Sequence, residues 1–100
     1  MFLFNETIGI DKAVEEEWLR WMKEEHIVAV MNTGMFISSK IYKVLHEHDD
    51  ETTSYSIQYF SNSIDNVQKY LEDYAPGLIE QFQRKFKDRH VAFRTLLLEI

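Results

Sequence analysis

The stretch TTSYSIQYF, residues 52–60, decides the fold. Its residues alternate between the two sides of an extended chain: Tyr55, Ile57 and Tyr59 on one side, and Ser54, Ser56, Gln58 and Phe60 on the other. Alternation with aromatic and β-branched residues is typical of a β-strand. The preceding stretch MFISSKIYKVLHEH, residues 35–48, is dense in Ile, Tyr and Val and predicts a partner strand, with the acidic residues 49–51 in the turn.

The chain on either side of this hairpin predicts two more strands and two helices. Residues 2–9 alternate in the same way, and VAFRTLLLEI, residues 91–100, ends the chain as a fourth strand. The first helix begins after Asp11, which suits the N-cap, drifts in its periodicity at residues 26–28, and ends at Gly34. Its apolar face consists of Val14, Trp18, Trp21 and Met22.

The second helix is capped by Asn62 or Ser63 and is interrupted at residues 75–77, because Pro76 cannot continue the helical hydrogen bonds. Its apolar residues are Ile64, Val67, Tyr70, Leu71 and Tyr74, and after the interruption Leu78, Phe82 and Phe86. The order of elements is therefore βαββαβ, which is the ferredoxin-like arrangement. We expect an α+β fold with a single domain over residues 1–100, in which a four-stranded antiparallel sheet carries both interrupted helices on one face.

Both faces of the predicted sheet carry apolar side chains, although the helices of one chain can cover only one face. With the hairpin tip at residues 49–50, Tyr42 lies opposite Ile57. The second face then presents Ile37, Ile41, Leu45, Phe60, Leu96 and Leu98. An exposed apolar sheet favours burial against a second copy around a two-fold axis, so we expect a homodimer that forms a dimeric α/β barrel. A monomer that tolerates scattered surface apolars is the alternative.

A polar set accompanies these apolar residues on the predicted second face: Asn5, Thr7, Ser56, Gln58 and Arg94. Between two packed sheets, such side chains could line a pocket for a small molecule or form hydrogen bonds across the dimer.

Composition limits the possible functions. The chain has 100 residues, of which 45% are apolar, as in globular proteins. Seventeen acidic and eleven basic residues give a formal net charge of −6, which opposes binding to nucleic acid or to anionic membranes. Cysteine is absent, which excludes disulfides, thiol nucleophiles and thiolate metal sites. No stretch approaches the roughly 18 apolar residues of a membrane span, and the N-terminus lacks the basic region of a signal peptide, so we expect a cytoplasmic protein.

Several runs of the sequence resemble the domain-of-unknown-function family 4286, whose members are short bacterial proteins of about this length. The runs are EEEWLRWMKEEHI (15–27), NTGMF (32–36), TTSYSIQYF (52–60), YLEDYAP (70–76) and HVAFRT (90–95). The resemblance spans nearly the whole chain and implies the dimeric α/β-barrel type of ferredoxin-like domain. It implies no catalytic residue. The wider dimeric-barrel group includes monooxygenases, haem-degrading enzymes and small-ligand effector domains, and a shared fold does not establish shared chemistry.

The stretch HEHDDE, residues 46–51, has the residue types of a metal site. His46 and His48 point the same way if the strand continues through them, and they could chelate zinc, nickel or copper. A site needs a third ligand, which Asp49, Glu51 or a neighbouring subunit would have to supply. The alternative, which we favour, is a polar hairpin tip with solvated histidines, so we expect no metal site and no cofactor.

Other candidate residues have structural interpretations. His26 lies beside two glutamates at a helix end, where a cation is favoured over a catalytic base, and the basic run RKFKDRH, residues 84–90, is typical of a helix C-terminus. Tyr55 and Tyr59 have the spacing of the stacking aromatics in RNA-recognition domains, but they lie on the side predicted to face the helices. One of the two tryptophans, Trp18 and Trp21, is expected in the core and the other at an edge.

Two functions follow from these observations. The first is a cytoplasmic homodimer that serves as a binding or interaction module, because the sheet is apolar on both faces and no catalytic constellation is present. The second is a dimeric α/β-barrel enzyme of the monooxygenase type, or a small-ligand-binding domain, that uses the space between the two sheets. The sequence names no substrate or ligand for either function.

Overall fold

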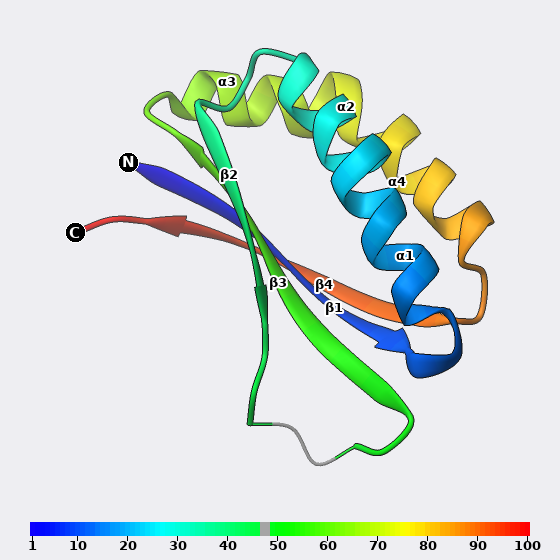
Figure 1. Ribbon diagram of the computed structural model, residues 1–100. Coiled ribbons are helices and arrows are strands. Elements are labelled where there is room, and N and C mark those ends of the chain that lie inside the picture. The colour runs from blue at the N-terminus through cyan, green and yellow to red at the C-terminus, as the bar shows by residue number, and fades with distance from the viewer. Residues whose placement is uncertain (47–48) are drawn as a thin grey trace.

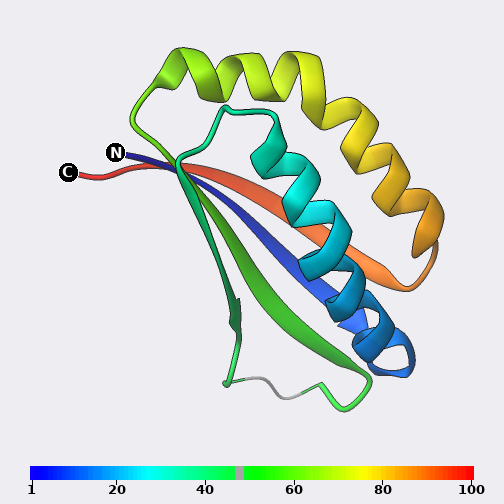
Figure 2. The ribbon, with the colours of Figure 1, turned by 45° about the horizontal axis from the view of Figure 1, so that its top comes forward.

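The computed structural model describes residues 1–46 and 49–100 and has the predicted ferredoxin-like βαββαβ order (Figure 1). The strands are β1 (Phe2–Asp11), β2 (Ser38–Lys43), β3 (Thr52–Ser61) and β4 (His90–Leu98). The helices are α1 (Glu15–Trp21), α2 (Ile27–Asn32), α3 (Ile64–Lys69) and α4 (Ala75–Lys85), with a 3₁₀ turn at Lys12–Val14. The strands form one antiparallel sheet in the order β2-β3-β1-β4. All helices lie on one face of this sheet (Figures 1 and 2).

The predicted helix boundaries are confirmed by their capping contacts. The Asp11 carboxylate accepts a hydrogen bond from the backbone N–H of Ala13 at 2.8 Å. Ser63 caps α3 by accepting from the backbone N–H of Asn66 at 3.2 Å. Gly34 follows α2 with a φ of 76°, a conformation that costs glycine little. The basic residues Arg84 and Lys85 lie in the last turn of α4, as the sequence predicts.

The helices form two continuous pairs, α1 with α2 and α3 with α4, and each pair is joined by one π-helical segment. The segment Met22–His26 joins α1 to α2, and the segment Tyr70–Tyr74 joins α3 to α4. A π-helical turn holds an extra residue, which explains why the apolar periodicity drifts at residues 26–28. The predicted break at these positions is therefore a π-helical segment inside a continuous helix. The predicted interruption at residues 75–77 is likewise not a gap, because Pro76 lies in the first turn of α4. Figure 2 shows the change of direction between α3 and α4.

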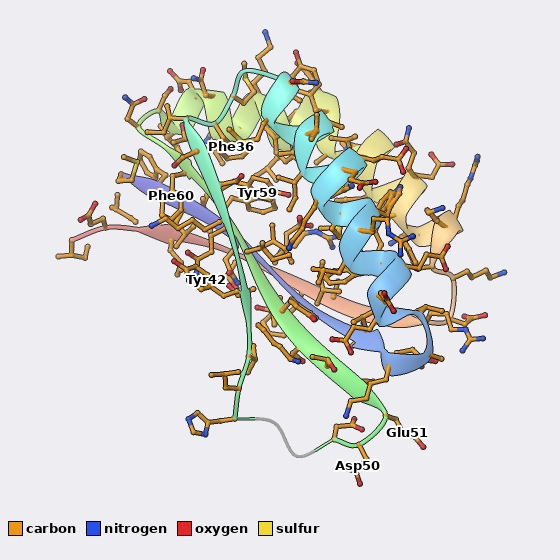
Figure 3. The ribbon with its side chains drawn as sticks, in the orientation of Figure 1. Phe36, Tyr42, Asp50, Glu51, Tyr59 and Phe60 are labelled. Atoms are coloured by element: carbon orange, nitrogen blue, oxygen red, sulfur yellow. The ribbon has the colours of Figure 1, made fainter. Side chains whose placement is uncertain are left out.

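The hydrophobic core fills the space between the sheet and the helices. Tyr55, Ile57 and Tyr59 of β3 are buried there, which confirms the side predicted for them. Figure 3 shows Tyr59 and Phe36 between the two layers and Tyr42 on the far side of the sheet. Trp18 is fully buried and Trp21 is half-buried, as expected for one core and one edge tryptophan.

The register of β2 differs from the prediction by one residue. Ile41, and not Tyr42, lies opposite Ile57, so Ile41 faces the helices and packs against the core. The register predicted from a hairpin tip at residues 49–50 is therefore wrong. A slip of one residue moves every side chain of a strand to the other face, and the observed register is the one that packs Ile41 against the core. Ile37 and Leu45 lie just outside β2 and are exposed.

The predicted face of three β4 residues is also wrong. Arg94, Leu96 and Leu98 lie opposite Glu6, Phe4 and Phe2, on the helix side. Residues directly opposite in an antiparallel pair share a face, so the second face of β4 presents Val91, Phe93, Thr95 and Leu97. Alternation separates these two sets correctly but does not say which faces the helices, because both contain apolar residues.

Candidate functional site

The face of the sheet away from the helices is here called the open face. It consists of Leu3, Asn5, Thr7 and Gly9 of β1, Ser38, Lys40 and Tyr42 of β2, Ser54, Ser56, Gln58 and Phe60 of β3, and Val91, Phe93, Thr95 and Leu97 of β4. Large apolar side chains on it are strongly exposed: Val91 is 72% exposed and Phe93 is 64% exposed. Six apolar residues were predicted for this face, and the strand register confirms Phe60. Ile41, Leu96 and Leu98 lie on the helix side, and Ile37 and Leu45 lie outside the strands.

A row of hydrogen-bonded polar side chains runs along the middle of the open face. Ser56 Oγ donates to Asn5 Oδ1 at 2.6 Å, and Asn5 Nδ2 donates to Thr7 Oγ1 at 3.0 Å. Gln58 Nε2 donates to Ser56 Oγ at 3.3 Å. These four residues are the predicted polar set without Arg94. The middle of the central strands β1 and β3 thus carries neutral polar groups. Val91, Phe93 and Leu97 of β4 flank them on one side, and Tyr42 of β2 lies on the other.

The open face carries almost none of the charge of this acidic protein. Among the strand residues that the structure describes, the register places two charged side chains on this side, Lys40 and Asp11, and Asp11 lies at the very end of β1. The Lys40 ammonium lies 5.6 Å from the centre of the Phe60 ring, a cation–π distance. A shallow apolar hollow of about 290 Å³ adjoins the face, with Leu3, Phe60 and Leu97 among its lining residues.

A second group of polar and ionisable side chains lies on the helix side, where the sequence did not predict a site, and all but Arg94 are buried. Glu6 is 2% exposed in the core, and its Oε2 accepts a hydrogen bond from Arg94 Nε at 2.8 Å. His26 and Tyr70 come from the two π-helical segments and Tyr59 from β3, and all three are buried. We call Glu6, His26, Tyr59, Tyr70 and Arg94 the buried polar cluster. The sequence signal that could have found it is Glu6 itself, which occupies an inward position between Phe4 and Ile8.

Charges and burial perturb the titration of this cluster. Burial raises the pKa of Glu6, and the neighbouring Arg94 guanidinium only partly offsets that effect. Burial also raises the pKa of Tyr59 and of Tyr70, and the negative charge of Glu6 raises both further. For His26, burial and the positive charge of Arg94 lower the pKa to about 4. His26 is therefore a neutral ring packed against Trp21 and Phe82, and the predicted role of a helix-end cation is wrong.

The lowered pKa of His26 predicts a loss of stability in mild acid. The pKa is 6.5 for an unperturbed histidine and about 4 in the fold, so protonation below pH 6.5 favours the unfolded chain. At about 1.4 kcal/mol per pKa unit, His26 removes roughly 3 kcal/mol of unfolding free energy between pH 7 and pH 4. Urea unfolding of the wild type and of His26→Phe at fixed protein concentration measures this. The variant should lose less stability on acidification, and parallel pH profiles would contradict the assignment. The carboxyl groups are present in both proteins, so their titration does not affect the comparison. This includes Glu6, whose raised pKa has the opposite effect on stability.

The hairpin stretch HEHDDE forms no site in the described residues. His48 and Glu47 lie outside them, His46 is exposed, and Asp49 Oδ1 accepts from the backbone N–H of Glu51 at 2.8 Å. Figure 3 shows Asp50 and Glu51 at the end of the hairpin. Across residues 1–46 and 49–100, no group of three or more His, Asp or Glu side chains is arranged to hold a metal ion. In the same residues, no helix has the length and apolar character needed to cross a membrane.

Solved structures share this fold at low sequence identity. HapK from Hahella chejuensis is 8% identical, with 100% of this chain and 93% of HapK covered and a TM-score of 0.72. A dimeric ferredoxin-like protein from an uncultured marine organism is 17% identical, with 100% and 95% covered and a TM-score of 0.70. SnoaB from Streptomyces nogalater, a cofactor-independent oxygenase, is 8% identical, with 98% and 92% covered and a TM-score of 0.63. Identities this low show the fold alone.

The family comparison covers the whole chain. No curated protein matches the sequence. The profile of the domain of unknown function DUF4286 matches residues 1–100 and so includes both the polar row of the open face and all members of the buried polar cluster. The resemblance seen in the sequence is confirmed, and the chain belongs to the DUF4286 family.

Proposed function

We propose that this protein is a homodimeric binding module of the cytoplasm, in which two copies pack open face against open face around a two-fold axis. The observation that carries the proposal is the pattern of the open face. Val91, Phe93, Leu97 and Tyr42 are exposed on it in a single chain, and exposed apolar patches of this kind mark interaction surfaces.

The low charge of the open face is compatible with a second copy as the partner. In a two-fold interface each residue meets the same surface on its partner, so a charged face would repel itself. The chain has a net charge of −6, yet its described strands keep their charges away from the open face except for Lys40 and the terminal Asp11. Such a face is compatible with its own copy.

The size of the face also fits a dimer. Strands spaced about 4.8 Å apart with a rise of about 3.3 Å per residue give the face an area of roughly 550 Å². Two copies would bury roughly 1,100 Å², which just clears the minimum of about 1,000 Å² for a specific interface. Two proteins with the same fold, from uncultured marine organisms, are dimeric ferredoxin-like proteins, and this supports the proposal.

Sedimentation equilibrium of the wild-type protein tests the proposal. We expect a dimer of twice the 12.0 kDa chain mass at micromolar concentration. An interface of this size lies at the lower limit for a specific dimer, so its stability at such concentrations depends on close packing of the apolar groups at its edges. A monomer across the micromolar range would remove the support for the module.

A second candidate function is binding or conversion of a small molecule between the two sheets. Packed sheets lie about 10 Å apart, and the short side chains of Asn5, Thr7 and Ser56 would fill that distance incompletely, leaving polar groups around a gap. SnoaB, a cofactor-independent oxygenase, has the same fold. Thermal-shift screening with haem, quinones, flavins and divalent metals tests this candidate. A compound that raises Tm in the wild type but not in Asn5→Leu would support it, and a screen without any shift would remove it.

A further inference from the structure

The buried polar cluster contains a carboxylate that the packing of the core does not explain. Glu6 is 2% exposed and lies between the core residues Phe4 and Ile8 on the helix side of β1. Removing a carboxylate from water costs several kcal/mol unless its oxygens are satisfied. Arg94 satisfies only Oε2, and Glu6 Oε1 has no hydrogen-bond partner.

Two more polar atoms without a partner belong to the same cluster. Four buried side-chain polar atoms in the described residues lack a hydrogen-bond partner, and three of them are Glu6 Oε1, His26 Nδ1 and Tyr59 OH. Buried polar groups are almost always paired in native proteins, and unpaired ones mark a missing water, ion or ligand or a catalytic role. Tyr59 interacts electrostatically with Glu6, and His26 interacts with Arg94, so all three unpaired atoms belong to the surroundings of one ion pair.

The backbone of both helices is irregular at this cluster. His26 ends the π-helical segment Met22–His26, and Tyr70 begins the π-helical segment Tyr70–Tyr74. π-Helical turns are rare, and they occur frequently at functional sites because they reposition side chains that a regular helix would point elsewhere. This backbone feature is independent of the unpaired atoms, and both lead to the same residues.

The cluster reaches the surface at one side, along β4, through Arg94. The Arg94 side chain is 28% exposed, although its partner Glu6 is buried. The next residues of β4 on the helix side are Leu96, which is 44% exposed, and Leu98, which is also exposed. The helices therefore leave this end of the sheet uncovered. Leu96 and Leu98 form an exposed apolar surface next to Arg94 on the edge strand β4.

We propose that the buried polar cluster is a binding site for a small uncharged molecule with an apolar body and a hydroxyl group. The hydroxyl donates a hydrogen bond to Glu6 Oε1, and the apolar body lies over Leu96 and Leu98. Glu6 and Arg94 offset each other's charge, so the site favours neither a cation nor an anion. Oε1 accepts hydrogen bonds but offers none, which makes a donor on the ligand the decisive feature.

Two naphthalene probes that differ only in the donor test this proposal. 1-Naphthol carries the hydroxyl, and 1-methoxynaphthalene has the same body without it. Calorimetric titration of the full chain should show that 1-naphthol binds roughly tenfold or more tightly, since a hydrogen bond to a charged acceptor contributes at least that much. Amide shifts in heteronuclear NMR should change at Glu6, His26 and Arg94.

Variants locate the preference. Glu6→Gln keeps the shape of the side chain but replaces the carboxylate by a neutral amide, which is a weaker acceptor, and should reduce the preference for 1-naphthol. Glu80→Gln is the matched control, because Glu80 pairs with Arg84 on the surface of α4 at 2.6 Å, and it should keep the preference. If Glu6→Gln does not fold, the comparison of the two probes on the wild type still decides.

Three results would overturn the proposal: no binding of either probe, equal binding of both, or NMR shifts confined to the open face. If Glu6 Oε1 binds only a water molecule, neither probe will bind, and the proposal is wrong. Because shifts at Thr7 or Phe93 report the open face and shifts at Glu6 report the cluster, failure of this site is distinguishable from failure of the proposed dimer.

Discussion

Replacing Phe93 with glutamate is expected to convert the dimer into a monomer. Phe93 is 64% exposed in the single chain, so the substitution costs the fold little. In the dimer, each copy would bury a carboxylate against apolar groups of its partner. At roughly 2 kcal/mol for each carboxylate, the two copies together should raise the dissociation constant on the order of a thousandfold. Sedimentation equilibrium of the variant measures the change.

Val28→Glu is the matched control for this substitution. Val28 is 45% exposed on α2, in the helix layer, and the variant adds the same charge. It should leave the dissociation constant within a few-fold of the wild type. If Val28→Glu dissociates the dimer and Phe93→Glu does not, the interface lies on the helix layer and the account of the open face is wrong.

Replacing Arg94 with methionine is expected to destabilise the fold strongly at neutral pH. The variant leaves the Glu6 carboxylate buried without a cation, and the cheapest relief is to take up a proton. The reference pKa of the carboxyl is 4.5, so protonation at pH 7 costs up to roughly 3 kcal/mol at about 1.4 kcal/mol per pKa unit. The free energy of unfolding, measured in urea, should fall by about this amount.

The pH dependence of this loss identifies its cause. The pKa of Glu6 in the folded variant lies above the value of the unfolded chain, so stability is regained as the pH falls toward 4.5. At pH 5 the loss should shrink to under about 1 kcal/mol. Arg84→Met removes an exposed Arg–Glu pair on α4 and should cost less than about 0.5 kcal/mol at either pH.

A double variant tests whether the stability of the fold depends on the ion pair itself. Glu6→Met combined with Arg94→Met replaces the pair by apolar groups, and buried pairs replaced in this way usually leave stability unchanged or increase it. The double variant should recover most of the loss of Arg94→Met. If Arg94→Met costs no more than Arg84→Met, Glu6 is not charged in the folded protein and our description of the cluster is wrong.

The order and type of the elements were predictable because local signals agree. Strict alternation in residues 52–60, the N-caps at Asp11 and Ser63, and Gly34 each fix one element or one boundary without reference to the rest of the chain. The polar row of Asn5, Thr7, Ser56 and Gln58 was also predictable, since alternation within β1 and β3 places these residues together on one face.

The register of β2 and the inward face of β4 were not predictable from local patterns. The hairpin loop between Lys43 and Thr52 does not reveal its register, and β4 is apolar on both faces, so only packing against β3 and β1 decides. The buried polar cluster was missed for a related reason. Glu6 occupies an inward position of β1, but its partner Arg94 is 88 residues away in the sequence and was predicted on the opposite face.

Contacts between two copies of the chain test the central claim most directly. A mixture of ¹³C-labelled and unlabelled protein, unfolded and refolded together, yields dimers in which isotope-filtered nuclear Overhauser effects arise only between copies. We predict intermolecular contacts from the methyl groups of Leu3, Val91 and Leu97 to the ring of Phe93. Intermolecular contacts from Val28 or Leu71 of the helix layer, without contacts from the open face, would contradict the account.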